Sequence, residues 1–238
     1  MPTFTHGKEA TVFINGYEVS DHLSSVTVSG EADTVEVSTL GSTDKSYIGG
    51  MRDATVSAEG FYAGSSSDID GEMSTNLGAT TTWTSVMEAD AIGAIAYGAR
   101  AIETTYEVGA EIGGAVAITI EGQVTGGREA ARVLHPHGSE TSTGTTTGLD
   151  NSASTANGAA AYLQVTAASG TTPTLDVKVQ HSSDGTTYAD LLTFTQVTGA
   201  NAYERVATTG TVNRYLRVEF TIGGTSPDFT FHVAAARL

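Results

Sequence analysis

Cysteine is absent from all 238 residues, which excludes disulfide bonds and thiolate metal sites. No stretch approaches the eighteen consecutive apolar residues of a membrane-spanning helix. The first residues also lack a basic segment followed by an apolar one, so we expect no secretory signal and synthesis in the cytoplasm. Positive charge is scarce as well, since 11 Lys and Arg face 27 Asp and Glu. A surface with this balance repels polyanions and disfavours tight binding of nucleic acid.

Glycine, serine and threonine are abundant instead. Charged residues make up 16% of the chain and aromatic residues 7%, a composition typical of all-β proteins. Hydrophobic residues reach 39%, so a chain of this length can bury a core. We therefore expect an all-β protein with little helix.

The acidic residues are concentrated in the first part of the chain. Residues 1–135 hold 19 Asp and Glu against 6 Lys and Arg, whereas residues 159–238 hold 6 against 5. Several carboxylates fall on the polar phase of alternating strands and are expected to line one sheet face. That face is either a solvated outer surface or the wall of a pore formed by oligomerisation. The residues concerned are Glu36, Asp53, Glu59, Glu103, Glu107 and Glu121.

Alternation of apolar and polar residues predicts a series of strands in the front part. Asn15-Gly16 lies between two apolar segments, the strongest short signal for a hairpin. Residues 41–50 form a polar, glycine-bounded loop whose Tyr47 and Ile48 have nothing local to bury them, which indicates a docking loop. After a loop over 64–82, a capping pattern predicts one short helix at 82–91. Further strands are expected at 23–29, 33–40, 52–62, 94–97, 101–108 and 115–124.

The middle of the chain has the composition of a linker. Residues 136–158 are rich in Ser, Thr and Gly and nearly free of charge, which indicates a flexible connection. Residues 159–238 then contain six alternating segments at the spacing of a β-sandwich. We therefore predict a β domain at 1–135, a linker at 136–158 and a second, smaller sandwich of Ig-like or jelly-roll type at 159–238.

Motifs for catalysis are missing from the sequence. It contains no nucleophile elbow, no phosphate-binding loop and no zinc-protease motif, so we expect neither an enzyme nor a cofactor. Asp68, Asp70 and Glu72 place oxygens at alternate positions but lack the spacing of a calcium loop. His135 and His137 could coordinate a metal ion but have no third ligand nearby in the sequence. We expect no metal site at either place.

Four stretches of the front part form a recognisable series, at 13–26, 33–41, 45–60 and 107–124. The first reads Phe-Ile-Asn-Gly-Tyr-Glu-Val, and the third contains Lys-Ser-Tyr-Ile-Gly-Gly-Met-Arg-Asp. Together they resemble the major tail tube protein of long, non-contractile-tailed bacteriophages of the siphophage type. The resemblance covers about residues 8–135.

This resemblance implies a twisted β-sandwich or barrel with a flanking helix, six copies of which close their inner sheets into a ring. Rings of the family stack into a virion tail tube for DNA ejection, with other tail proteins at its ends and the tape measure protein and passing DNA inside. The family's long loop matches residues 39–51 and contacts neighbouring subunits or the next ring, so the resemblance makes Tyr47 and Ile48 part of an inter-ring docking loop and would explain their exposure. The family has no catalytic residues to carry over, and no membrane partner is expected.

The back part resembles the β-sandwich modules that decorate the outside of phage tail tubes. Its stretch 175–188 is also similar to jelly-roll carbohydrate-binding folds. Glycan sites present an aromatic platform, for which Tyr188, Tyr203 and Tyr215 are candidates, although aromatic residues on sandwich strands more often belong to the core. The alternative function is therefore a two-domain phage fibre or cell-surface glycan-binding protein.

Overall fold

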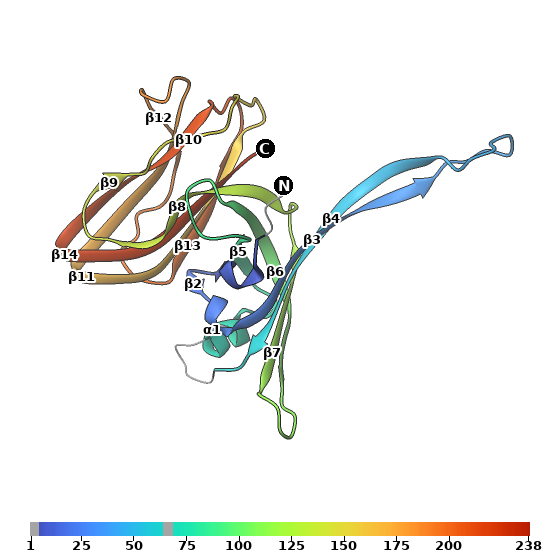
Figure 1. Ribbon diagram of the computed structural model, residues 1–238, viewed down its shortest axis with the longest axis horizontal. Helices are drawn as coiled ribbons and strands as arrows, with labels where there is room; N and C mark the ends of the chain where they lie inside the picture. The colour runs from blue at the N-terminus through green and yellow to red at the C-terminus, as the bar shows by residue number, and fades with distance from the viewer. Residues whose placement is uncertain (1–4, 64–68) are drawn as a thin grey trace.

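The structure is a computed structural model that describes residues 5–63 and 69–238. Strands dominate it, which confirms the all-β prediction, and one short α-helix is present in the described part (Figure 1). The helices are η1 (Gly7–Glu9), η2 (Ser20–His22) and α1 (Ile69–Asn76). The front strands are β1 (Thr11–Ile14), β2 (Tyr17–Glu18), β3 (Leu23–Glu36), β4 (Tyr47–Phe61), β5 (Thr80–Val86), β6 (Ile95–Gly109), β7 (Ala117–Val124) and β8 (Glu129–Glu140). The back strands are β9 (Gly144–Thr145), β10 (Leu149–Asp150), β11 (Ala159–Ser182), β12 (Ala189–Thr193), β13 (Ala202–Thr208) and β14 (Tyr215–Arg237).

The helix predicted over 82–91 is wrong, because most of that segment belongs to strand β5 or the turn after it. β5 pairs with β1 on one side and with β6 on the other. Its Thr, Trp and Val side chains suit a pleated, buried surface, and pairing on both sides outweighs the capping signal. The observed helix α1 lies inside the segment expected to be a loop, of which residues 64–68 fall outside the described part.

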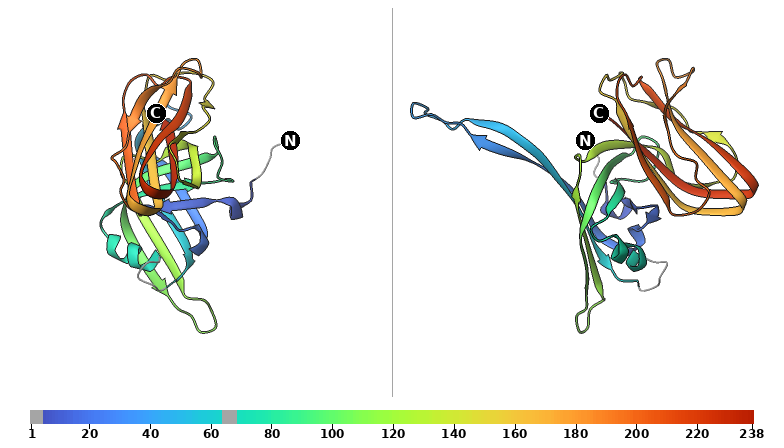
Figure 2. Two further views of the ribbon diagram at one scale, coloured as in Figure 1. Left: turned by 90° about the vertical axis from the view of Figure 1, so that its left-hand side faces the viewer. Right: turned by 180° about the vertical axis from the view of Figure 1, so that it is seen from behind.

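The front half is built on an antiparallel sheet in the order β3-β4-β7-β6. One face of this sheet packs on a hydrophobic core that includes Val56, Ile120, Trp83 and Met73. The elements that cover this face are α1, β1, β2 and β5. Figure 2 (right) shows the sheet nearly edge-on, with these elements and the back half on one side of it. No element of the described residues covers the other face.

β3 and β4 continue beyond the core as a long hairpin, hereafter the arm (residues 30–53), which projects from the body in Figure 1. All of its residues are exposed. The loop expected at 41–50 is therefore the end of a paired hairpin: the ladder runs to the pair Glu36 and Tyr47, and Val37 N donates to Ser46 O at 2.8 Å. The tip between these positions leaves the ladder, which is also irregular between Ala32 and Thr34.

The back half contains two long strands, β11 and β14, paired over most of their length. A core that includes Leu163, Val177, Phe220 and Phe231 lies between its layers, as expected for a sandwich. β8 extends the same sheet and carries the chain directly from the front half into the back half. Residue 135 therefore lies inside a strand.

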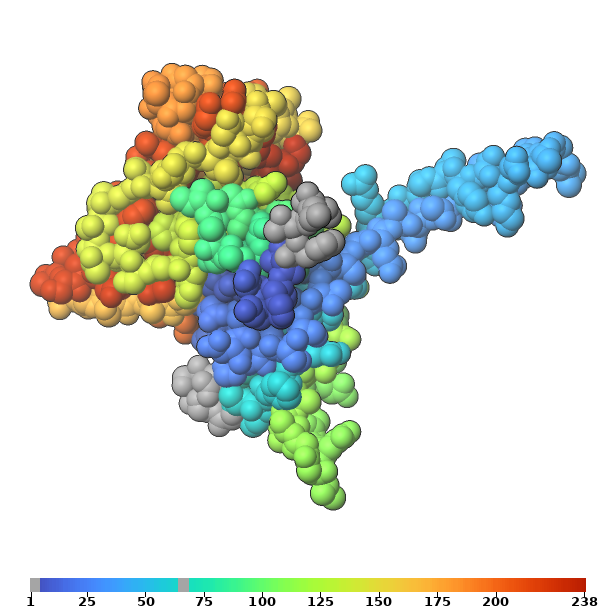
Figure 3. Space-filling model, in the orientation of Figure 1, coloured from blue at the N-terminus to red at the C-terminus, as the bar shows by residue number. Residues whose placement is uncertain are grey.

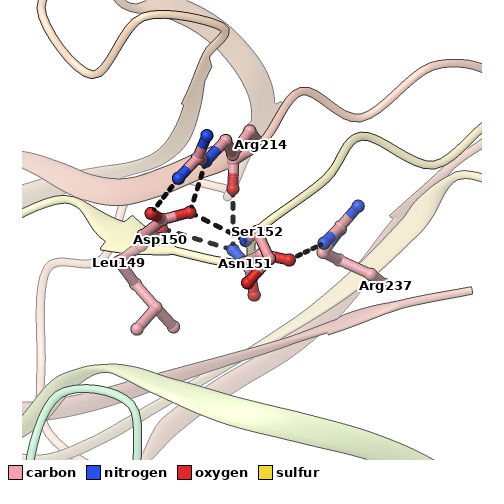
Figure 4. A network of polar contacts seen from close by, with 6 residues as sticks. All are labelled: Leu149, Asp150, Asn151, Ser152, Arg214 and Arg237. Carbon is pink, nitrogen blue, oxygen red and sulfur yellow. Dashed lines mark hydrogen bonds and ion pairs between the residues drawn. The ribbon is translucent and has the colours of Figure 1, made fainter.

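Residues 136–158 do not form the flexible linker that their composition predicts. The segment contains the end of β8 and the short strands β9 and β10, both of which pair with β14. Figure 4 shows the contacts that hold it: Asp150 binds the Arg214 guanidinium at 2.6 and 2.5 Å, and Arg237 donates to Asn151 O at 3.3 Å. Low-complexity Thr-rich sequence lacks a core pattern, but its backbone can still pair on an existing strand. The partition at 135 and 159 stays a prediction.

The two halves also share buried contacts. Phe13 and Val86 of the front pack with Val133, Ala234 and Ala236 in a third core cluster. The buried Gln164 amide accepts from Gly16 N at 2.7 Å and donates to Thr82 O at 3.2 Å. This packing is that of a domain interior.

Candidate functional site

The bare side of the β3-β4-β7-β6 sheet carries four of the six carboxylates expected on one face. We call Asp53, Glu59, Glu107 and Glu121 the acidic face. Cross-strand register brings them together, since Glu59 and Glu107 both pair with Thr119, and Glu121 lies between Ser57 and Thr105. Thr105 Oγ1 donates to Glu121 Oε2 at 3.0 Å. Side chains opposite one another across strands lie about 5 Å apart at Cβ, so the carboxylates share one continuous surface.

Glu36 and Glu103 do not belong to the acidic face. Glu36 lies on the arm, where it forms a 2.8 Å ion pair with Lys45, and a register shift between Ala32 and Thr34 separates it from Glu31, the partner of Asp53. Glu103 precedes a register shift between Glu103 and Thr105, so its side chain turns into the front core and is only 1% exposed. The prediction of a shared face is therefore wrong for Glu103, whereas Glu36 is an exposed residue of the arm for which the shared face stays a prediction.

Glu103 is a buried acid with an altered pKa. Burial, and next the charge of Glu72, raise its pKa to about 7. Neither carboxylate oxygen has a hydrogen-bond partner in the part of the chain that the structure describes. Nearby, Tyr106 donates to Asp70 at 2.7 Å, and burial raises the pKa of its phenol. Sequence reasoning missed this group, because a one-residue bulge leaves no mark in the hydrophobic pattern.

The arm exposes an unusual amount of apolar surface. Tyr47 and Ile48 are each 55% exposed, and they lie on opposite sides of the hairpin because they are neighbours in one strand. Val35, Val37, Leu40 and Met51 are exposed on the same arm. Clusters of this kind commonly mark interaction surfaces. The arm was partly visible in the sequence as a loop with two unexplained apolar residues.

The acidic-face sheet has two open edges. Among residues 5–63 and 69–238, β3 pairs only with β4, and the last part of β6, residues 104–109, pairs only with β7. Along the open edge of β3, residues 23–30 read Leu-Ser-Ser-Val-Thr-Val-Ser-Gly and contain no charge and no proline. Soluble monomers usually protect such an edge with Lys, Pro or a covering segment.

The other candidate groups are dispersed. Within residues 5–63 and 69–238, no three His, Asp or Glu side chains are placed to hold a metal ion. The His135 ring stacks on Phe231 with the ring centroids 4.1 Å apart, and the His137 ring meets Phe13 edge-on at a centroid distance of 5.1 Å. Asp68 lies outside the described part. None of the helices in these ranges is long and apolar enough to cross a membrane.

The three tyrosines of the glycan alternative lie in different surroundings. Arg217 covers the ring of Tyr188 at 4.0 Å, and Arg214 lies 5.0 Å from that of Tyr215. Tyr203 is 42% exposed and lines a pocket of about 470 Å³. The structure thus leaves one of the three rings free as a platform.

An acidic sheet face, two open edges and an exposed apolar arm are the surface features that distinguish this β protein. No protein-family model matches the sequence, and no curated protein does. Solved structures that this chain matches in part include a chain of the virion of a native gene transfer agent particle (15% identity, TM-score 0.42, 53% of this chain and 98% of that one). The SPP1 tail tube is similar at 12% identity and TM-score 0.44 over 53% of this chain and 80% of that one.

A chain of the phage p2 baseplate in its activated conformation with Sr matches over 96% of this chain and 98% of its own length, at 9% identity and TM-score 0.35. Identities this low leave the function to be argued from the chain's own geometry.

Proposed function

We propose that this chain is a ring-forming subunit of a phage-type tail tube, a structural virion protein whose homohexameric rings stack into a conduit for DNA. The observation that carries the proposal is the β3-β4-β7-β6 sheet, which has one bare acidic face and two uncharged or nearly uncharged open edges. Tape measure protein and passing DNA would occupy the lumen, and other tail proteins the tube ends.

Ring closure follows from the two edges. The β3 edge of one copy pairs with the end of β6 in the next copy, a head-to-tail contact that closes into a ring when the rotation between copies is right. Six four-stranded sheets would make a barrel of about 24 strands, well above the size at which barrels enclose an open channel. Edge pairing also supplies partners for the unpaired backbone groups of β3.

The direction of the sheet in the ring follows from where the bulk of the chain lies. The core, helix α1 and the back half all cover the face opposite the acidic face (Figure 2). Six wedge-shaped copies pack around an axis with the thin side inward, so the acidic face lines the lumen. Carboxylates there repel DNA phosphates and keep DNA from adhering to the wall.

The arm is assigned to contacts between subunits. Replacing Tyr47 and Ile48 by Ser leaves the fold intact, because both side chains are already exposed, and weakens assembly. A matched control is Leu77→Ser, which removes an apolar side chain that is 58% exposed away from the arm. Equal assembly of the arm variant and the control would contradict the role of the arm.

Negative-stain electron microscopy and light scattering across protein concentration test the function itself. Hollow rings or striated tubes are expected. For the lumen, Glu59→Lys/Glu121→Lys tubes assembled with short duplex DNA should protect that DNA from nuclease, whereas wild-type tubes should not. A chain that stays monomeric at high concentration, with or without preformed tube ends, and that binds immobilised glycans would support the glycan alternative instead.

A further inference from the structure

The two ends of the acidic-face sheet differ in shape and charge. Register places the turn between β6 and β7 beside the end of β4, since Phe61 pairs with Ala117, whereas the arm leaves from the opposite end. Figure 3 shows both the arm and this turn standing out from the body. Each copy therefore has one projecting turn at one end of the sheet and the root of the arm at the other.

The β6–β7 turn (residues 110–116) is anionic and apolar. Its tip contains Glu111 and Ile112, and the Ile112 side chain is fully exposed at 110% of its reference area. Residues 101–127 contain four Glu and neither Lys nor Arg. Burying an apolar side chain that solvent surrounds lowers the free energy, so a contact between Ile112 and another surface is favourable.

A pocket of about 650 Å³ lies at the root of the arm, at the opposite end of the same sheet. Its lining includes Arg52, Tyr97, Arg128 and the pair Gly126-Gly127. Arg128 lies 4.9 Å from the Tyr97 ring, and in the described ranges neither Arg52 nor Arg128 forms an ion pair.

Two carboxylates also line the pocket, but one of them is already engaged. Asp53 accepts from Gln123 Nε2 at 2.5 Å, and Glu31 lies beside it. The two glycines have positive φ angles of 85° and 87°, and space is open where a Cβ would stand. The pocket therefore combines two available guanidinium groups, an aromatic ring and an unobstructed rim.

We propose that this pocket receives the β6–β7 turn of a second copy, with Glu111 against Arg128 and Ile112 buried beside the Tyr97 ring. The contact rests on the proposed tube function and accounts for stacking of one ring on the next. It joins opposite ends of the sheet, so it repeats without limit along the axis, as a head-to-tail contact must in a filament. The bidentate geometry of Arg suits a carboxylate partner.

Two charge reversals test this pairing. Glu111→Arg alone and Arg128→Glu alone each place like charges in the contact. Each variant should still form rings but should need at least about a tenfold higher protein concentration to form tubes. The effect is large because a weak ion pair is repeated around each ring and acts multivalently. In a mixture of the two variants, the reversed tip of one variant can meet the reversed pocket of the other. The unchanged tip and the unchanged pocket can meet as they do in the wild type. The mixture should form tubes within about twofold of the wild-type concentration.

The double variant Glu111→Arg/Arg128→Glu is the matched control, because it keeps the net charge of the wild type and should also form tubes. Recovery in the mixture shows that neither single variant is misfolded. Tubes formed by each single variant at the wild-type concentration would overturn the docking proposal and leave the tube function standing. If neither the mixture nor the double variant restores tube formation, the turn does not dock in this pocket and the proposal is wrong. Wild-type protein that forms no rings would remove the tube function as well.

Discussion

Replacement of Glu103 by Gln should make the stability of the protein depend less on pH. In the folded chain burial keeps Glu103 protonated up to a pKa of about 7, whereas the unfolded chain releases the proton above its ordinary value of 4.5. Between these values the unfolded state binds fewer protons, so the free energy of unfolding falls as the pH rises. The whole interval corresponds to about 3 kcal/mol. Gln is neutral at every pH and should not show this loss.

Urea unfolding at pH 5.0 and 8.5, at concentrations where the protein is monomeric, measures the effect. The wild type should lose about 2.5 kcal/mol more than Glu103→Gln between these two values, because at pH 5.0 the unfolded carboxyl has already released part of its proton. Comparison of two pH values cancels any constant cost of burying the amide. Glu121→Gln, an exposed carboxylate on the same sheet, serves as control and should follow the wild type. Equal pH dependence of Glu103→Gln and the wild type would refute the account of Glu103.

Three further outcomes are expected. Gly98→Ala should destabilise the protein by about 1–3 kcal/mol in urea unfolding, because a Cβ there would overlap the Tyr162 ring, while Gly109→Ala, with open space around it, should cost at most about 1 kcal/mol. In the Glu103→Gln background, the urea midpoint of unfolding should drop as the pH falls below about 6.5. Burial lowers the pKa of His135 and His137 in the folded chain, so in this pH range only the unfolded chain takes up the protons. A midpoint that does not change with pH would contradict this account. A chain ending at residue 158 should bind a hydrophobic dye and show no cooperative unfolding, because it lacks the strands that cover Phe13 and Val86.

Local sequence signals predict the structure correctly where a short segment adopts its conformation independently of distant partners. Asn15 and Gly16 both have positive φ, 51° and 82°, which is the turn that an Asn-Gly pair favours. The strands at 52–62 and 115–124 also follow their alternation closely. Four of the six carboxylates reached one face for the same reason, because side chains two positions apart point the same way.

The failures all depend on partners distant in sequence. β5 has helix-capping residues, but two neighbouring strands fix it as a strand. Residues 136–158 have the composition of a linker, but β14 binds their backbone. The bulge that buries Glu103 belongs to the pairing of β6 with β7. The arm and its root pocket are likewise products of register between strands, which composition and periodicity do not encode.

Salt should strengthen the proposed contacts within a ring and weaken those between rings. Edge pairing between β3 and β6 brings acidic faces of neighbouring copies together around the lumen, and their repulsion is reduced when the Debye length falls from about 10 Å at 0.1 M salt to about 3 Å at 1 M. The contact between Glu111 and Arg128 is an attraction between exposed charges, which the same salt weakens. Rising salt should therefore favour rings over tubes. The burial of Ile112 is insensitive to screening, so tubes that persist in high salt would mean that this apolar contact, and not the ion pair, dominates stacking.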